Sequence, residues 1–188
     1  MKQEIQSVAI RLFSEHGYGS VTLPMIAKVC GCKPSDVYKH FRTKGDIVHT
    51  LRAEGFKRLS DSLQECAFGN DPQERLIRFG RIYLQFALSE PDLFILMFNL
   101  GGRLSRAEVA SGSMPEASFP LFRQIVREVM VTGLFGETDF ETVLFGLWSV
   151  AHGMACLLIG ERYKEVHGEV NADWLIERVL RFAARQLF

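Results

Sequence analysis

The sequence contains little cysteine. Four cysteines, Cys30, Cys32, Cys66 and Cys156, are scattered over 188 residues. A small secreted fold held by disulfides needs more of them at closer spacing, so we expect reduced thiols. The N-terminal residues 1–17 carry charged side chains and lack the apolar core of a signal peptide. We therefore expect a cytoplasmic protein.

The chain also lacks the patterns of a sheet and of an enzyme. No alternation of apolar and polar residues of any length occurs, and no Asn-Gly or Asp-Gly pair marks a hairpin. No nucleophile with a base, no carboxylate pair and no phosphate-binding loop can be recognised. The pair Cys30 and Cys32 has no second Cys/His pair at zinc-finger spacing. We expect neither an enzyme, nor a metal site, nor a cofactor.

Helical patterns fill the chain instead, and 47% of its residues are hydrophobic, enough for a sizeable core. The predicted helices span residues 3–16, 22–30, 34–41, 44–68, 71–89, 91–101, 115–133, 138–160 and 171–187, with a loop at 101–114. Capping patterns start four of them: Thr22, Thr43 with Asp46, Thr138 with Glu141, and Asn171. The predicted fold is all-α, with about nine helices.

Charge is unevenly distributed along a chain whose net charge is zero. Residues 1–60 contain ten basic and five acidic side chains, a net charge of +5, and the remaining 128 residues balance it. A basic N-terminal part indicates a module that binds a polyanion, although clustering on a solvated face would give the same pattern.

Residues 22–41 predict a helix-turn-helix. Two short helices are joined by a turn that contains Gly31, and Ile26, Ala27 and Val37 are placed to face inward. The second helix is then free to enter the major groove of DNA.

The motif I-x2-V-A-x2-L-F-x3-G-Y-x3-T-L-x2-I-A-x3-G-x5-V-Y-x-H-F-x2-K-x2-I over residues 5–47 resembles the DNA-binding domain of TetR-family bacterial regulators. Trp148, His152 and Gly153 resemble a feature of one branch of TetR C-terminal domains. The resemblance implies a three-helix DNA-binding domain at residues 1–46 and a helical effector-binding and dimerisation domain at residues 47–188.

The resemblance also implies which residues contact DNA. Phosphate contacts fall on Thr22, Tyr38, His40 and Lys44, and contacts near base edges on Lys33, Pro34, Ser35 and Lys39. Two residues depart from the usual pattern. Lys33 stands where a small capping residue is common, and Asp36 places a negative charge beside phosphates.

An apolar run at residues 143–160 has no charged side chain. The length of the run is at the lower limit for a membrane span. His152, Ser149 and the capping pattern before the run favour an interface helix without a membrane. Small residues form a stripe along it: Gly146, Ser149, Gly153, Cys156 and Gly160. In TetR-like proteins the last two helices of each subunit form a four-helix dimer bundle, which here would include Trp174 and Phe182. A homodimer reading a palindromic operator in double-stranded DNA is expected.

Aromatic residues at helical spacing suggest an effector cavity, although such residues also fill ordinary cores. The candidates are Phe94, Met97, Phe98, Phe119, Phe122, Trp148 and His152. The sequence thus predicts a TetR-like transcription regulator, a repressor released by a small apolar or aromatic effector. The alternative is a helical ligand- or partner-binding protein without sequence-specific DNA binding.

Overall fold

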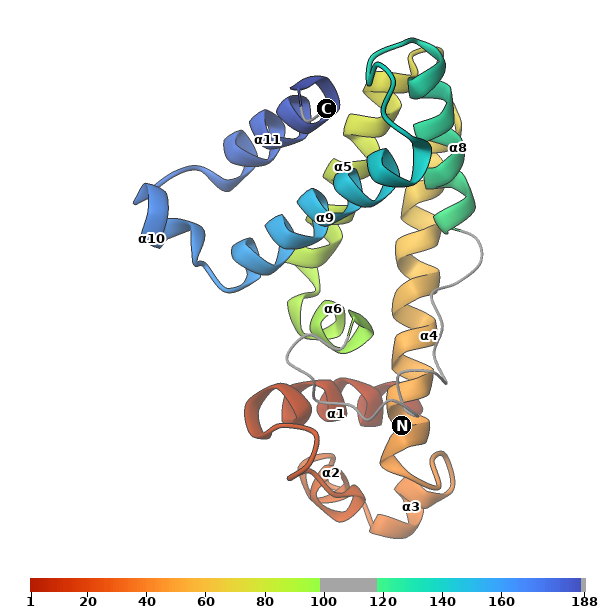
Figure 1. Ribbon diagram of the computed structural model, residues 1–188. Coiled ribbons are helices and arrows are strands. Elements are labelled where there is room, and N and C mark those ends of the chain that lie inside the picture. The colour runs from red at the N-terminus through yellow and green to blue at the C-terminus, as the bar shows by residue number, and fades with distance from the viewer. Residues whose placement is uncertain (99–117, 187–188) are drawn as a thin grey trace. The chain divides into compact units, whose positions relative to one another are not determined.

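The computed structural model describes residues 1–98 and 118–186, and these residues form ten α-helices and no strand. The helices are α1 (Lys2–His16), α2 (Leu23–Val29), α3 (Pro34–Tyr38), α4 (Lys44–Leu63), α5 (Pro72–Ser89), α6 (Pro91–Phe98), α8 (Ser118–Val131), α9 (Phe140–Ile159), α10 (Tyr163–His167) and α11 (Ala172–Gln186) (Figure 1). A 3-10 turn, η1 (Gln64–Ala67), follows α4. The prediction of an all-α fold is confirmed.

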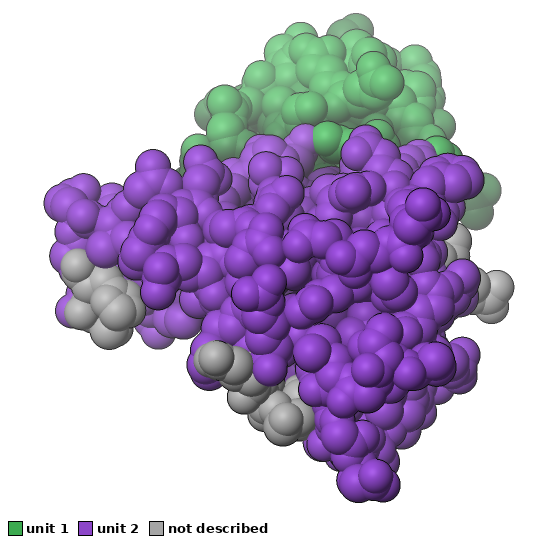
Figure 2. Space-filling model, turned by 90° about the horizontal axis from the view of Figure 1, so that it is seen from above, with its two compact units in different colours: residues 1–58, 92–114 green, residues 59–91, 115–188 purple. Residues whose placement is uncertain are grey.

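The chain divides into two compact units, which Figure 2 colours separately. The first comprises residues 1–58 and 92–114, and the second residues 59–91 and 115–188. The predicted boundary between residues 46 and 47 separates a DNA-binding part from an effector-binding part, and it stays a prediction.

The first unit has its core between α1, α2, α3 and the start of α4. Apolar side chains there are almost fully buried: Ile5, Ala9, Leu12, Phe13, Val21, Ile26, Ala27, Val37, Phe41, Ile47 and Val48. Helix α6 packs against α4 at Gly55, where an added Cβ would lie 2.5 Å from Met97 Sδ. Arg52 donates from Nε to the Met97 carbonyl oxygen at 3.1 Å, and Ser14 donates to Asp92 at 2.6 Å.

The second unit is built around α5, which contacts α8, α9 and α11. Gly80 allows close packing of α5 on α11, because an added Cβ would lie 2.5 Å from Leu180 Cδ2. Arg81 forms an ion pair with Glu177 on α11, and Arg75 forms one with Glu128 on α8. The helices on the two sides of α5 are thus held by both packing and charge.

Most predicted helix starts are confirmed. Thr22 caps α2 and accepts from the Met25 N–H, and Asn171 caps α11 and accepts from the Trp174 N–H. Thr43 and Asp46 form the reciprocal bonds of a capping box at the start of α4.

Four expectations differ from the structure. Asp139, not Thr138, caps α9, because its extended backbone lets its carboxylate accept from the Thr142 N–H at 2.9 Å. Helix α3 ends at Tyr38 rather than 41, and α4 ends at Leu63 rather than 68, where the 3-10 turn η1 follows. Helix α10 was not predicted. The predicted loop at 101–114 and the helix start at Pro115 lie outside the described residues.

Candidate nucleic-acid interface

Helices α2 and α3 lie side by side and form a helix-turn-helix (Figure 1). Ile26 and Ala27 on α2 and Val37 on α3 are fully buried, as the sequence predicts. The turn between the helices passes through Gly31, whose φ of +67° lies in the left-handed region that glycine adopts readily. The inner faces of both helices are therefore fixed, and the opposite face of α3 remains exposed.

Seven of the eight residues expected at DNA are exposed in or beside this motif. They are Thr22, Lys33, Pro34, Ser35, Tyr38, Lys39 and His40. Tyr38 is 51% exposed, whereas the nearby Phe41 is buried in the core. Their placement provides hydroxyl, imidazole and ammonium donors on one surface.

The eighth residue, Lys44, is bound within the protein. Its ammonium group donates to the carbonyl oxygens of Tyr18 at 2.6 Å, Gly19 at 3.2 Å and Val21 at 2.9 Å. It also lies 4.4 Å from the centre of the Tyr18 ring. Because an ammonium group has three donors, this arrangement uses all of them and fixes the loop between α1 and α2.

Asp36 forms two interactions on α3. One carboxylate oxygen lies 2.7 Å from Lys39 Nζ, and the other accepts from the Lys33 N–H at 3.3 Å. The bond from Lys39 lowers the pKa of the Asp36 carboxyl below its ordinary value, and the same bond raises the pKa of Lys39. Asp36 thus makes the N3 half of a capping box by accepting from the N–H of the N-cap residue, while the Lys33 side chain makes no cap bond. Sequence reasoning missed this bond although the spacing of three residues signals it.

The expected effector residues fall into the two units. Phe94 and Met97 are fully buried in the first, with Phe98 in contact with Phe94 and Phe56. The remaining four, Phe119, Phe122, Trp148 and His152, belong to the second unit.

The four residues of the second unit form a continuous aromatic cluster. Phe119 lies 6.0 Å from Trp148 between ring centres, and Trp148 lies 5.9 Å from His152. Tyr83 on α5, which sequence reasoning missed, is hydrogen-bonded to His152 Nδ1 at 2.8 Å. Burial raises the pKa of Tyr83 and lowers that of His152, so both side chains are neutral near pH 7. Tyr83 is buried and His152 half-buried, so the aromatic cluster contains a polar pair that is a suitable anchor for a polar group of a ligand.

Helix α9 leaves an apolar face uncovered. It has a mean hydropathy of 1.8 over its most apolar 18 residues, of which 33% are buried, so by length and composition it could span a membrane. Phe145, Ser149, Gly153 and Leu157 follow one another at intervals of four and are all exposed. A Cβ added at Gly153 would meet no other atom within 4 Å. Of the other small residues, Gly146 and Cys156 are half-buried and Gly160 is exposed.

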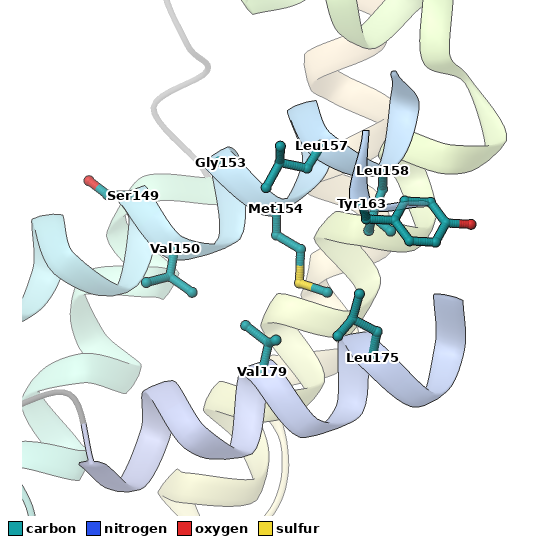
Figure 3. A pocket seen from close by; sticks show the side chains of 9 residues that line it. All are labelled: Ser149, Val150, Gly153, Met154, Leu157, Leu158, Tyr163, Leu175 and Val179. Atoms are coloured by element: carbon teal, nitrogen blue, oxygen red, sulfur yellow. The ribbon is translucent and has the colours of Figure 1, made fainter. Parts of the chain in front are cut away.

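Helix α11 presents a similar face, with Trp174 at 54% and Phe182 at 53% exposure. A cavity of about 390 Å³ opens between α9, α10 and α11. Figure 3 shows Met154 and Val150 extending from α9 toward Leu175 and Val179 of α11. None of the expected effector residues lines this cavity, whereas Ser149 and Gly153 of the expected dimer interface do.

Within the described part of the chain, no group of three or more His, Cys, Asp or Glu side chains could hold a metal ion. A basic helix-turn-helix with an exposed second helix, followed by a helical bundle, defines the class of helix-turn-helix DNA-binding proteins.

Two family models match the chain. The model for bacterial regulatory proteins of the tetR family matches residues 5–51, and the tetracyclin repressor-like C-terminal domain matches residues 76–183. The second match alone covers more than half of the chain, so the chain belongs to the TetR family. Membership in this family of regulators also supports the prediction that the protein is not an enzyme.

Known proteins are similar to this chain in sequence or in fold. The biofilm operon icaADBC HTH-type negative transcriptional regulator IcaR of Staphylococcus epidermidis is 28% identical over 132 residues, covering 70% of this chain and 64% of IcaR. The TetR family transcriptional regulator PfmR of Thermus thermophilus has a TM-score of 0.78 at 22% identity, covering 98% of both chains. The fatty acid degradation regulator FadR of Bacillus halodurans has a TM-score of 0.79 at 18% identity, covering 99% of this chain and 95% of FadR. The two structures share the fold of this chain.

Proposed function

We propose that the chain is a DNA-binding transcription regulator that represses its target genes in the cytoplasm and leaves DNA when a small apolar or aromatic effector binds. The observation that carries the proposal is the exposed polar face of α3 on a buried helix-turn-helix core. The match of residues 5–51 to the tetR-family model supports it.

In this proposal α3 enters the major groove. Lys33, Pro34, Ser35 and Lys39 lie near base edges, while Thr22, Tyr38 and His40 bond phosphates. Lys44 acts through the α1–α2 loop that it holds, which keeps α2 and its Thr22 cap in place beside the backbone of the DNA.

The assembly we propose is a homodimer through α9 and α11. Phe145 and Leu157 on α9, with Trp174 and Phe182 on α11, are large apolar side chains exposed on a single chain. Ser149 and Gly153 between them allow a second helix to approach closely. Two recognition helices about 34–36 Å apart would then read a palindromic operator.

The effector site we propose is the aromatic cluster of the second unit, with the Tyr83–His152 pair as its polar anchor. A ligand with a ring or acyl chain and one polar group fits that chemistry. The description of FadR as a fatty acid degradation regulator favours an acyl compound as the first to be tried, and that of IcaR as a negative regulator favours repression.

The direct test is a mobility-shift assay with genomic fragments at several salt concentrations. A specific complex is expected whose affinity falls steeply with salt concentration. For each phosphate that the protein neutralises, a tenfold rise in salt should lower the binding constant by nearly a factor of ten. Tyr38→Phe removes one hydroxyl that is proposed to donate to a phosphate, and it is expected to weaken binding to all DNA sequences alike. Tyr163→Phe, a hydroxyl deletion in the second unit, is the control that should leave binding unchanged. Equal binding to every fragment would contradict the proposal.

A second candidate is a helical ligand- or partner-binding protein without sequence-specific DNA binding. The engagement of Lys39 by Asp36, and of Lys44 by three carbonyl groups, favours it, because both lysines were expected at DNA. A chain that binds acyl compounds in a thermal-shift assay but prefers no DNA at low salt would support this candidate.

A further inference from the structure

An exposed ion pair lies on the outer face of α3. The Lys39 side chain is 71% exposed and that of Asp36 is 32% exposed, and their charged atoms are 2.7 Å apart. The second carboxylate oxygen of Asp36 is held by the Lys33 N–H at the start of the helix. Asp36 therefore has two partners on its own chain, and Lys39 is oriented by its bond to Asp36.

A carboxylate on a groove-facing helix is unfavourable unless donors meet it. Phosphates repel it, and most atoms on base edges in the major groove are acceptors. The donors there are the amino groups of cytosine (N4) and adenine (N6). The groups nearest to Asp36 on its own chain, Lys39 and the backbone of Lys33, stabilise its charged form, so it meets DNA as an anion.

The spacing of the ion pair matches the edge of one base pair. In the major groove a G·C pair presents the acceptors N7 and O6 of guanine and then the N4 amino donor of cytosine. O6 and N4 are hydrogen-bonded to each other, at about 2.9 Å. Lys39 Nζ and Asp36 Oδ1 present a donor and an acceptor at 2.7 Å, the complementary order at a similar spacing.

An A·T pair fits this arrangement less well. Lys39 could donate to adenine N7, or to thymine O4 in the reversed pair, while Asp36 accepts from the adenine N6 amino group. In either case Lys39 meets one acceptor beside the amino group, whereas guanine offers it two, N7 and O6. The ion pair therefore favours a G·C pair, where it can make one bond more than at an A·T pair.

We infer that Asp36 and Lys39 read a single G·C pair in each half-site as one unit, with Lys39 donating to guanine O6 and N7 and Asp36 accepting from the cytosine amino group. This inference rests on the proposed function, since it names the base pair that the same helix recognises. It assigns to Asp36, the residue that departs from the family pattern, a role in specificity.

The test selects binding sites from random duplexes with the intact wild-type chain and with Asp36→Ala, Asp36→Asn and Glu15→Gln. The wild type is expected to fix a G·C pair at one position of each half-site. Asp36→Ala should lose that preference by about 5-fold or more at that position alone, the range expected for one specific base contact. Asp36→Asn should shift it toward A·T, because an amide bonds adenine N6 and N7. Glu15→Gln removes an exposed carboxylate from α1 and should leave the selected sequence unchanged.

A second measurement deletes the amino group itself. An operator carrying a 2-pyrimidinone nucleoside in place of that cytosine should bind the wild type about 5-fold or more weakly than the unmodified operator does. Asp36→Ala should bind the modified and the unmodified operator equally well. Melting curves confirm that each variant is folded. If Asp36→Ala prefers that G·C pair over the other base pairs as strongly as the wild type does, the inference is overturned. If the wild type enriches no duplex, the proposed function itself is overturned, and the inference with it.

Discussion

At the scale of single residues, Lys44 and His152 have roles that their position in the sequence does not reveal. Lys44 closes the α1–α2 loop by donating to three carbonyl groups, one of them at Val21, which is fully buried. His152 lies among aromatic rings and is hydrogen-bonded to a tyrosine 69 residues earlier in the chain. Both side chains act through partners that only the fold brings near.

Lys44→Met is expected to lower the free energy of unfolding by about 1–3 kcal/mol, because three carbonyl groups lose their donor and some of them are shielded from water. The measurement is urea denaturation of the intact chain. Lys28→Met, which removes an exposed lysine of the same basic segment, is the control and should change stability little. Equal stability of the two variants would show that Lys44 does not hold the loop.

Acid is expected to destabilise the chain partly through His152. Its pKa is lowered in the folded state by burial, from an ordinary value of 6.5. The unfolded chain therefore takes up the proton first, and stability is full above pH 6.5 and falls as the pH drops below it, by up to about 1.4 kcal/mol per pH unit. His152→Gln should flatten the profile of unfolding free energy between pH 7.5 and 5.5. The other histidines are present in both proteins and cancel, so parallel profiles would contradict the role of burial.

At the scale of helices, the sequence predicts what local chemistry decides. Thr22 and Asn171 cap helices through backbone groups three residues away, and both caps are confirmed. The inward positions Ile26 and Val37 also follow from helical spacing alone. Helix α10 could not be predicted in this way, because no side chain caps its five residues.

The candidate site was predictable to the same degree. The exposed residues of α3 follow from the helix-turn-helix spacing. Tyr83 could not be paired with His152, because α5 and α9 are far apart in sequence and meet only through packing. Phe145 and Leu157 could have been predicted on the exposed face of α9, because each lies four residues from a predicted small residue of the stripe, Ser149 or Gly153.

Gly55→Ala is expected to destabilise the chain by about 1–3 kcal/mol, although alanine favours a helix, because its Cβ would overlap Met97 and lie 3.1 Å from Leu93 Cγ. Gly45→Ala in the same helix is the matched control, since its Cβ would meet nothing nearer than 3.5 Å and should be neutral or stabilising. Thermal melting compares them. A gain in melting temperature for both variants would show that α6 yields at this contact.

At the scale of the whole molecule, α9 and α11 expose large apolar side chains that a single chain leaves in contact with water. Phe145, Leu157, Trp174 and Phe182 are all about half exposed. The family to which the chain belongs and the open space at Gly153 both favour a second copy as the cover.

Phe145→Asp is expected to convert a dimer into a monomer, because a charge would be buried in the proposed interface without a partner. Sedimentation equilibrium should give twice the 21.3 kDa chain mass for the wild type and the single mass for the variant at micromolar concentration. Val131→Asp at the end of α8, a position 88% exposed, should stay dimeric. A wild type that sediments at the single mass would refute the interface.

The uncovered face of α9 has a consequence for dosage. If dimerisation buries this face, the melting temperature rises with the concentration of the protein. At low concentration a larger share of the chains is monomeric, and these chains are the first to unfold and be degraded. Occupied operators then decline more steeply than the supply of chains as expression falls. A gene controlled in this way would pass from silent to active over a narrow range of regulator abundance.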